Sequence, residues 1–236
     1  SNHALQTAIA CRRYNLNPIL YLVDVIGEGI SDPKANILLD QILGAEIKII
    51  DFKEDEDEFA AMYRAKEESK KYAQEISETE ADYYLIPPGG ASPRGTLGFV
   101  NAYLEMKVQE FENDLNFKNI FHATGTGGTL AGLTAANRFM NDELKVHGIN
   151  VSHKDDSYLD EVAELSTAAL KLLNIDFNLA SSDVIVDNNF VGEGYEIPST
   201  EANRAVKIFA EDEGIFLDPV YTGKAAAGMI NYLEQE

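Results

Sequence analysis

The sequence predicts an α/β fold of two open, mostly parallel sheets with helices on both faces. Short apolar runs typical of buried strands alternate with helical patterns almost from end to end of the 236 residues. Such alternation is characteristic of strand–helix–strand units, whose parallel strands are covered by the connecting helices. A chain of this length can bury one large core or two modest ones.

The first half of the chain contains three expected strands, after an N-terminal helix around Cys11. Each strand is a short apolar run rich in β-branched or aromatic residues, and each helix has apolar residues three and four apart. The expected strands are ILYLVD (19–24), IKIIDF (47–52) and DYYLIP (82–87), and the helices after them are 36–45, 57–77 and 95–111.

The second half repeats the pattern. Ser199 or Thr200 can cap a last helix, and Gly214 can close it. We expect a small α/β domain over 1–105 and part of a larger, cofactor-binding α/β domain over 106–236. The expected strands here are NIFHAT (119–124), KVHGINV (145–151) and DVIVD (183–187). One expected helix follows the first of these strands and continues through Arg138, and a second spans 161–173. The last expected helix has an apolar stripe formed by Ala202, Ala205, Val206, Phe209 and Ala210.

Charge and composition exclude several classes of protein. Forty acidic against nineteen basic residues give a net charge of −21, which repels nucleic-acid backbones. No apolar run is long enough for a membrane span, and no signal peptide is recognisable. A single cysteine, Cys11, excludes an intramolecular disulfide. We expect a cytoplasmic protein with neither nucleic-acid nor membrane partners, and no pattern indicates a metal site.

A glycine loop after the strand 119–124 is the strongest local signal. In FHATGTGGTLAGL, amides of a glycine-rich turn can converge on one point, and the following helix start adds about half a positive charge. Such a turn favours a phosphate, although a tight strand-to-helix turn without a ligand is the alternative. The expected amide donors are Gly125, Thr126, Gly127, Gly128 and Thr129, with hydroxyl donors from Thr124, Thr126 and Thr129.

The spacing of the glycines limits which phosphate-containing ligand the loop can bind. GxGGxxxG differs from the dinucleotide pattern, and Ser152, His153 and Lys154 stand where an acid would contact the ribose of NAD. NADP, with Lys154 near its 2′-phosphate, stays open. No Lys-Ser or Lys-Thr follows the glycines, so a nucleoside triphosphate is disfavoured. A single phosphate on a small cofactor remains.

Several motifs together resemble the D-cysteine desulfhydrase and 1-aminocyclopropane-1-carboxylate deaminase family. They are SNHALQTA, NILLDQILGAE, IPPGGASPRGTLGFVNA, TGTGGTLAG and the stretch from GEGYEIPSTEANRA to DPVYTGKAAAG, in order from Ser1 to Gly228. The resemblance implies pyridoxal-phosphate enzymes of the tryptophan-synthase-like fold, fold type II. It also implies a cytoplasmic homodimer in amino-acid metabolism.

The resemblance assigns roles to individual residues. The loop from Thr124 to Thr129 would hold the cofactor phosphate, and Asn2 would bond the pyridoxal 3′-oxygen. Ser1 matches a serine beside the reactive carbon, and His3 a residue that grips the substrate carboxylate. Without the family, Ser1 would be a helix cap with Asn2 and His3 exposed behind it. Tyr221, with Thr222, would lie against the cofactor, and Tyr195 would face the substrate.

The activity implied is a β-elimination that converts D-cysteine into pyruvate, ammonia and sulfide. The deaminases carry a glutamate after the second tyrosine, whereas Glu196 follows Tyr195 and Thr222 follows Tyr221 here. If Thr222 rather than Glu196 faces the pyridine nitrogen, its neutral hydroxyl gives a weaker electron sink, which suits loss of a thiol better than opening of a cyclopropane. Deamination of aminocyclopropane carboxylate and a cysteate sulfo-lyase stay open. So does a non-catalytic protein that binds a phosphorylated metabolite.

Two parts of the family pattern have no match in this chain. The family's Schiff-base lysine lies before SNHA, and its His-Thr-Gly-Gly stretch lies beyond Glu236. The resemblance therefore implies a fold truncated at both ends, and a chain that is inactive as given. Lys224 is expected on the helix that begins in VYTGK, without a catalytic role.

Overall fold

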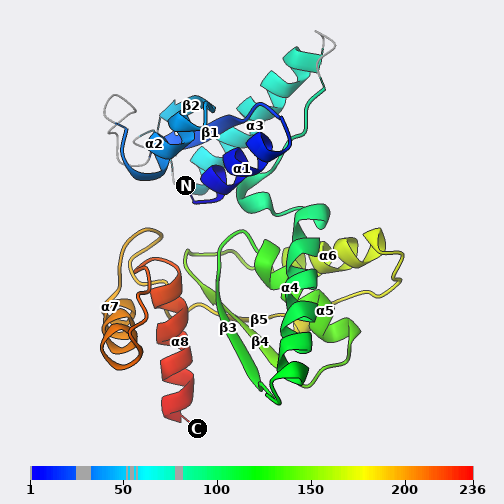
Figure 1. Ribbon diagram of the computed structural model, residues 1–236, viewed down its shortest axis with the longest axis vertical. Helices are drawn as coiled ribbons and strands as arrows, with labels where there is room; N and C mark the ends of the chain where they lie inside the picture. The colour runs from blue at the N-terminus through cyan, green and yellow to red at the C-terminus, as the bar shows by residue number, and fades with distance from the viewer. Residues whose placement is uncertain are drawn as a thin grey trace. The chain divides into compact units, whose positions relative to one another are not determined.

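The computed structural model describes residues 2–24, 33–51, 53, 56, 58–77 and 82–235. The chain divides into two compact units, Ser1–Pro88 and Gly89–Glu236 (Figure 1). No helix among the described residues is long and apolar enough to cross a bilayer.

The first unit is built on two parallel strands, β1 (Ile19–Asp24) and β2 (Glu46–Asp51). Their helices are α1 (Asn2–Arg13), α2 (Ala35–Ile42) and α3 (Glu58–Ser77). A small core forms where α1 meets β1, and the Arg12 guanidinium donates to the carbonyls that follow α2. The strands and helices predicted for residues 19–77 are confirmed to within a few residues.

The expected strand over 82–87 is wrong. These residues form no strand, and Tyr83 and Tyr84 are 50% and 62% exposed. An apolar aromatic run becomes a strand only when neighbouring strands and side chains receive it, because β-propensity mainly reflects packing. The sheet of this unit has two strands among the described residues instead of the three expected.

The second unit contains a parallel sheet of three strands in the order β3 (Asn119–Thr124), β4 (Lys145–Asn150) and β5 (Ile185–Asp187). One face carries α4 (Pro93–Glu112), α5 (Gly128–Phe139) and α6 (Tyr158–Leu172), and the other carries α7 (Thr200–Ile208) and α8 (Thr222–Gln235) (Figure 1). The predicted parallel sheets with helices on both faces are therefore confirmed.

The ends of the helices follow from short polar signals. Ser92 caps α4 by accepting the Gly95 amide at 3.1 Å, and Ser199 caps α7 by accepting the Ala202 amide at 3.0 Å. A π-helical turn, Phe209–Glu213, extends α7 to Gly214 in the left-handed conformation. The predicted division after residue 105 falls inside α4, whereas the two units divide before this helix, because α4 packs along α5 and α6.

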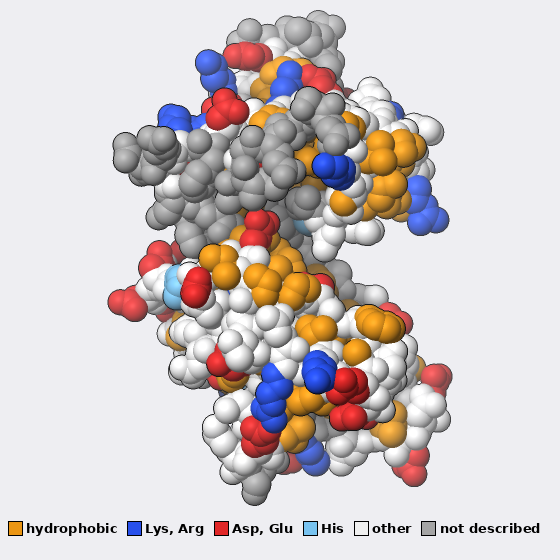
Figure 2. Space-filling model, turned by 90° about the vertical axis from the view of Figure 1, so that its left-hand side faces the viewer, with side chains coloured by type: hydrophobic (Ala, Val, Ile, Leu, Met, Phe, Trp, Pro, Cys, Tyr) orange, Lys and Arg blue, Asp and Glu red, His pale blue; other side chains and the backbone are white. Residues whose placement is uncertain are grey.

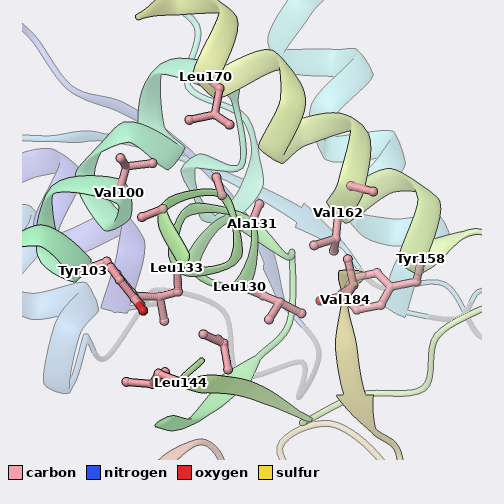
Figure 3. Close-up of a cluster of buried hydrophobic side chains, with 14 residues drawn as sticks. Val100, Tyr103, Leu130, Ala131, Leu133, Leu144, Tyr158, Val162, Leu170 and Val184 are labelled. Carbon is pink, nitrogen blue, oxygen red and sulfur yellow. The ribbon is translucent and has the colours of Figure 1, made fainter. Parts of the chain in front are cut away.

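Helix α5 forms the centre of the larger core. Figure 3 shows its Leu130, Ala131 and Leu133 between α4 and α6. A Cβ atom at Gly132 would lie 2.6 Å from the carbonyl oxygen of Thr96, so α4 and α5 approach almost backbone to backbone. This close packing against α4 holds the first turns of α5, which continue directly from the glycine loop.

Helix α8 closes the opposite face of the sheet. A second apolar cluster joins Ile149 of β4 to Phe190 and to the alanines of α7 and α8, Ala205, Ala225, Ala226 and Ala227. These small side chains let α8 lie close to the sheet. On the face that Figure 2 shows, acidic and basic side chains of the described residues are interspersed with apolar groups.

A buried polar network ties α4 to the turn before β4. The hydroxyl of Tyr103, which is fully buried, donates to Asp142 at 2.8 Å and accepts from Asn137 at 3.0 Å. Asn137 also donates to the carbonyl of Leu144 at 2.7 Å. Burial and the Asp142 carboxylate raise the pKa of Tyr103 to about 12, so the phenol stays protonated.

Replacing Tyr103 by Phe removes the hydroxyl and leaves buried polar atoms without their partner. We expect a loss of about 1–3 kcal/mol in the free energy of unfolding, measured by urea denaturation. Tyr63→Phe is the matched control, since Tyr63 is 64% exposed. Equal stability of the two variants would show that the network contributes nothing.

Candidate functional site

The ends of three strands meet at one edge of the sheet in the second unit. Thr124 of β3 is in register with Asn150 of β4, and Ile149 with Asp187 of β5. In open parallel sheets, ligands bind outside this carboxyl edge. The glycine loop leaves the sheet here, so the candidate site lies where the fold favours one.

The loop itself presents bare backbone at the start of α5. Gly127 precedes the helix with φ 86° and ψ −12°, a left-handed conformation, and provides no side-chain cap. A Cβ atom there would lie 3.0 Å from Val162 Cγ2. The first amides of α5 are thus left for an external acceptor, and the helix dipole favours a negative one.

The three loop threonines lie in different environments. Thr124 is buried, and its hydroxyl shares a hydrogen bond of 2.7 Å with Tyr158, whose pKa burial raises to about 12. Thr126 is exposed and Thr129 half-buried. Of the predicted hydroxyl donors, Thr124 is therefore occupied inside the unit. Lys154 lies over the ring of Tyr158, with Nζ 5.2 Å from its centroid.

The distribution of acidic side chains favours an anion at the glycine loop and disfavours an anion in the neighbouring pocket. Residues 119–133 contain no acidic side chain, in a chain of net charge −21. A neighbouring pocket of about 360 Å³ is lined by Thr126, Glu161 and Glu164 among others. Its two carboxylates would repel a phosphate. The amides of the loop, rather than this pocket, are the place for one.

The two predicted tyrosines come together although they are 26 positions apart in the sequence. The rings of Tyr195 and Tyr221 meet edge to face, with centroids 5.8 Å apart and planes at 80°. Their hydroxyls are hydrogen-bonded to each other. Two phenols in contact form a pair through which a proton can pass.

Asp218 builds the turn that carries Tyr221. Its carboxylate accepts the amides of Val220, Tyr221 and Thr222 at 2.8–2.9 Å and the Thr222 hydroxyl at 2.6 Å. Partial burial raises the pKa of Asp218, but these hydrogen bonds outweigh it and hold the pKa below its ordinary value. The Thr222 hydroxyl also accepts the Asp218 amide at 2.8 Å, so its one proton is already donated to Asp218.

Asn150 and Asn188 extend the polar edge of the sheet. Asn150 is fully buried and donates to the side-chain oxygen of Asn188. Its own Oδ1 is buried without a hydrogen-bond partner among the described residues. A buried acceptor of this kind suits a site whose donor comes from a ligand. Neither asparagine was predicted, although Asn150 ends a strand next to the glycine loop.

The remaining predicted residues belong to the first unit. Asn2 and His3 are exposed on the first turn of α1, as expected if Ser1 were a helix cap. Asn2 Oδ1 accepts a hydrogen bond of 2.7 Å from Asn36. Ser1 lies outside the described residues. The proposed roles of these three residues stay predictions.

His122 lies in β3, two residues before the end of the strand. Its Nδ1 is 3.0 Å from the carbonyl oxygen of Ala123, and its Nε2 is buried without a partner among the described residues. Burial lowers the pKa of His122 to about 4. The ring is therefore neutral at neutral pH, with the hydrogen on Nδ1 for the Ala123 carbonyl.

This neutral histidine predicts a pH dependence of stability. In the unfolded chain His122 binds a proton near pH 6.5, while in the folded chain it does so only near pH 4. Between these values the unfolded state binds more protons, so stability falls as the pH falls, by about 3 kcal/mol in total. In His122→Asn, the free energy of unfolding measured by urea denaturation at pH 7, 5.5 and 4.5 should lack the part of its pH dependence that His122 causes. His153→Asn, at an exposed position, should keep it; identical profiles for the two variants would contradict the assignment.

Comparison with known proteins decides the family. A family model described as pyridoxal-phosphate dependent enzyme matches residues 1–236. The chain belongs to this family. The cofactor of the family is pyridoxal phosphate, as the resemblance implied, and the glycine loop is the part of this chain that suits its phosphate.

Relatives within this pyridoxal-phosphate family share most of the chain. A "putative 1-aminocyclopropane-1-carboxylate deaminase" of Thermotoga maritima is 38% identical over 98% of this chain, and one of Pyrococcus furiosus is 35% identical over 98%. The crystal structure of an ACC deaminase homologue, 32% identical, superposes with a TM-score of 0.83 over 100% of this chain. The chain spans 69% and 66% of the two relatives and 66% of the solved structure. The crystal structure of a threonine deaminase, 14% identical with a TM-score of 0.60, shares the fold over 100% of this chain and 71% of its own.

The residues of the site fit pyridoxal phosphate. The phosphate requires donors without acids around it, and the amides of Gly127, Gly128 and Thr129 at the start of α5 meet that need. The ring requires aromatic and hydrogen-bonding neighbours, for which the Tyr195–Tyr221 pair and Asn150, at the end of β4, are available in the same unit. The cofactor would be held by backbone at one end and by side chains at the other.

Proposed function

We propose that the protein is a lyase that removes the β-substituent of a small amino acid, with D-cysteine as substrate. One water is consumed, and pyruvate, ammonia and hydrogen sulfide are released. The observation that carries the proposal is the hydrogen-bonded Tyr195–Tyr221 pair in the same unit as a phosphate-type loop. Membership of the pyridoxal-phosphate family supports it.

The residues of the chain would divide the work. Pyridoxal phosphate, when bound, withdraws electrons from the substrate carbon that carries the amino group. The amides after β3 hold the phosphate and so fix the position of the ring. The Tyr195 and Tyr221 hydroxyls accept and return a proton beside the substrate, and Asp218 keeps Tyr221 in place through its amide.

Deamination of 1-aminocyclopropane-1-carboxylate is the second candidate. The names of the Thermotoga and Pyrococcus relatives favour it. Breaking a carbon–carbon bond requires a stronger electron-withdrawing cofactor ring than losing a thiolate does, because a thiolate is a good leaving group whose conjugate acid has a pKa near 8.5. The neutral Thr222 after Tyr221, with its proton donated to Asp218, suits the easier reaction.

A product assay separates these candidates. The full-length protein, supplied with pyridoxal phosphate, is given D-cysteine, L-cysteine, D-cysteate and aminocyclopropane carboxylate in turn. We expect sulfide and pyruvate from D-cysteine. A four-carbon 2-oxo acid from aminocyclopropane carboxylate as the faster reaction would establish the second candidate. Sulfite from cysteate would identify a sulfo-lyase, and cofactor binding without any turnover would favour a non-catalytic binding protein.

A further inference from the structure

Lys224 is fully buried, and the proposed mechanism does not use it. It lies in the first turn of α8, where a helix residue without a catalytic role was expected. Its ammonium donates to three backbone carbonyls, of Val191 and Gly194 at 2.8 Å each and of Val151 at 3.3 Å. No carboxylate lies within ion-pair distance of it among the described residues.

This arrangement satisfies the ammonium without a counter-ion. The three N–H donors of a lysine meet three carbonyl oxygens, so the buried group has its full set of hydrogen bonds. Burial lowers the pKa of Lys224. The three hydrogen bonds to carbonyl oxygens act in the opposite direction, because such bonds favour the charged form. With its three donors bound in this way, the ammonium is held as a structural cation and is not presented as a nucleophile.

The three carbonyls belong to the segments that form the site. Val151 follows β4, and its amide donates to the Thr124 carbonyl at 3.1 Å, directly before the glycine loop. Val191 and Gly194 lie in the turn that follows β5, and Gly194 immediately precedes Tyr195. Lys224 therefore joins the end of β4 to the segment that carries Tyr195.

Tyr221, the other tyrosine, is connected to Lys224 through the first turn of α8. The Ala225 amide donates to the Tyr221 carbonyl at 3.0 Å, and the Asp218 carboxylate holds the Tyr221 amide. One side of the tyrosine pair is thus set by the first turn of α8. The other side depends on the bond from Lys224 Nζ to the Gly194 carbonyl, one residue from Tyr195.

We propose that Lys224 is a positioning residue, whose ammonium holds the Val191–Gly194 turn so that the Tyr195 and Tyr221 hydroxyls meet. The inference rests on the proposed function for its effect on turnover, but not for its effect on structure. A point charge among converging carbonyl oxygens is also the environment that a monovalent metal cation prefers. A cation close in size to an ammonium, such as potassium rather than the smaller sodium, should therefore be able to replace the lysine ammonium when the side chain is shortened.

Two variants of the full-length, cofactor-loaded protein test the proposal. Lys224→Met keeps the length of the side chain and removes the charge, and Lys224→Ala opens the space around the carbonyls. A displacement of about 1 Å at a reacting group costs about 100-fold in rate, so we expect kcat for D-cysteine to fall about 10- to 100-fold in both. Potassium or ammonium chloride should restore part of the kcat of Lys224→Ala, with sodium chloride at equal ionic strength as the salt control.

Matched controls separate positioning from stability. Lys207→Met, at an exposed lysine of α7, should have wild-type kcat and no response to potassium. Crystal structures of Lys224→Met and of Lys224→Ala in rubidium chloride give a readout that needs no activity. We expect the Tyr195 and Tyr221 hydroxyls to separate in Lys224→Met, and an anomalous peak among the three carbonyls in Lys224→Ala.

The outcomes distinguish this proposal from the proposed function. A folded Lys224→Met protein with the tyrosine hydroxyls still in contact would overturn the positioning role, whatever the wild-type protein catalyses. A wild-type protein without lyase activity would contradict the proposed function alone, and the crystal structures would still decide the role of Lys224. If neither variant folds at low salt, folding of Lys224→Ala in potassium but not in sodium supports the proposal, and no difference between the salts contradicts it.

Discussion

Gly127→Ala should weaken binding of pyridoxal phosphate about 10- to 100-fold. Gly127 has φ 86°, where a residue with a Cβ atom costs about 1–2 kcal/mol, and that atom would lie 3.0 Å from Val162. The backbone must shift to relieve this, which turns the first amides of α5 away from a bound phosphate. A charge-assisted hydrogen bond is worth about 1.5–3 kcal/mol, so loss of one accounts for the expected change in affinity. Titration of the apoprotein with the cofactor measures it.

Gly98→Ala is the matched control for this variant. Gly98 lies within α4, and a Cβ atom there would meet nothing within 4 Å. We expect unchanged affinity and a gain of about 0.5–1 kcal/mol in stability, since alanine is the better helix former. Unchanged cofactor affinity in Gly127→Ala as well would show that the loop does not hold the phosphate.

Tyr221→Phe should reduce kcat for D-cysteine about 100- to 10,000-fold, the range that proton transfer by a positioned side chain contributes. The substitution keeps the ring and removes the hydroxyl that meets Tyr195. Cofactor affinity should change little, because the glycine loop is untouched. Steady-state kinetics and a cofactor titration on the same preparation separate the two effects.

The partner tyrosine supplies the cross-check. If the two hydroxyls act as one unit, Tyr195→Phe and the double variant should each lose about as much kcat as Tyr221→Phe, because effects within a unit do not add. Tyr14→Phe, at an exposed position, should leave kcat unchanged. Multiplying losses in the double variant would mean that the two tyrosines act independently.

Most of the fold could be predicted because its signals are local. The apolar runs of β3 and β4 and the glycine loop between β3 and α5 determine a strand, a turn and a helix without reference to the rest of the chain. The run DYYLIP carries the same local signal and forms no strand, because pairing depends on neighbours that the run cannot specify. The limits of the two units depend in the same way on where α4 packs.

The residues of the candidate site show the same difference between local signals and contacts of distant segments. The glycine loop could be predicted from the spacing of its glycines, and the two tyrosines could be predicted from motifs that this chain shares with a family. Asp218, Asn150 and Lys224 escaped prediction because their roles depend on contacts between distant segments. Lys224 binds carbonyls 30, 33 and 73 residues away. In sequence it is one more lysine at the start of a helix, and only its burial reveals what it holds together.

The crystal structure of the full-length protein saturated with pyridoxal phosphate tests most directly whether the glycine loop holds the cofactor. We expect the phosphorus atom next to the amides of Gly125 to Thr129, with phosphate oxygens about 2.7–3.2 Å from the amide nitrogens. Density for the phosphate elsewhere in the protein, with these amides bonded to water or to the protein itself, would contradict this assignment.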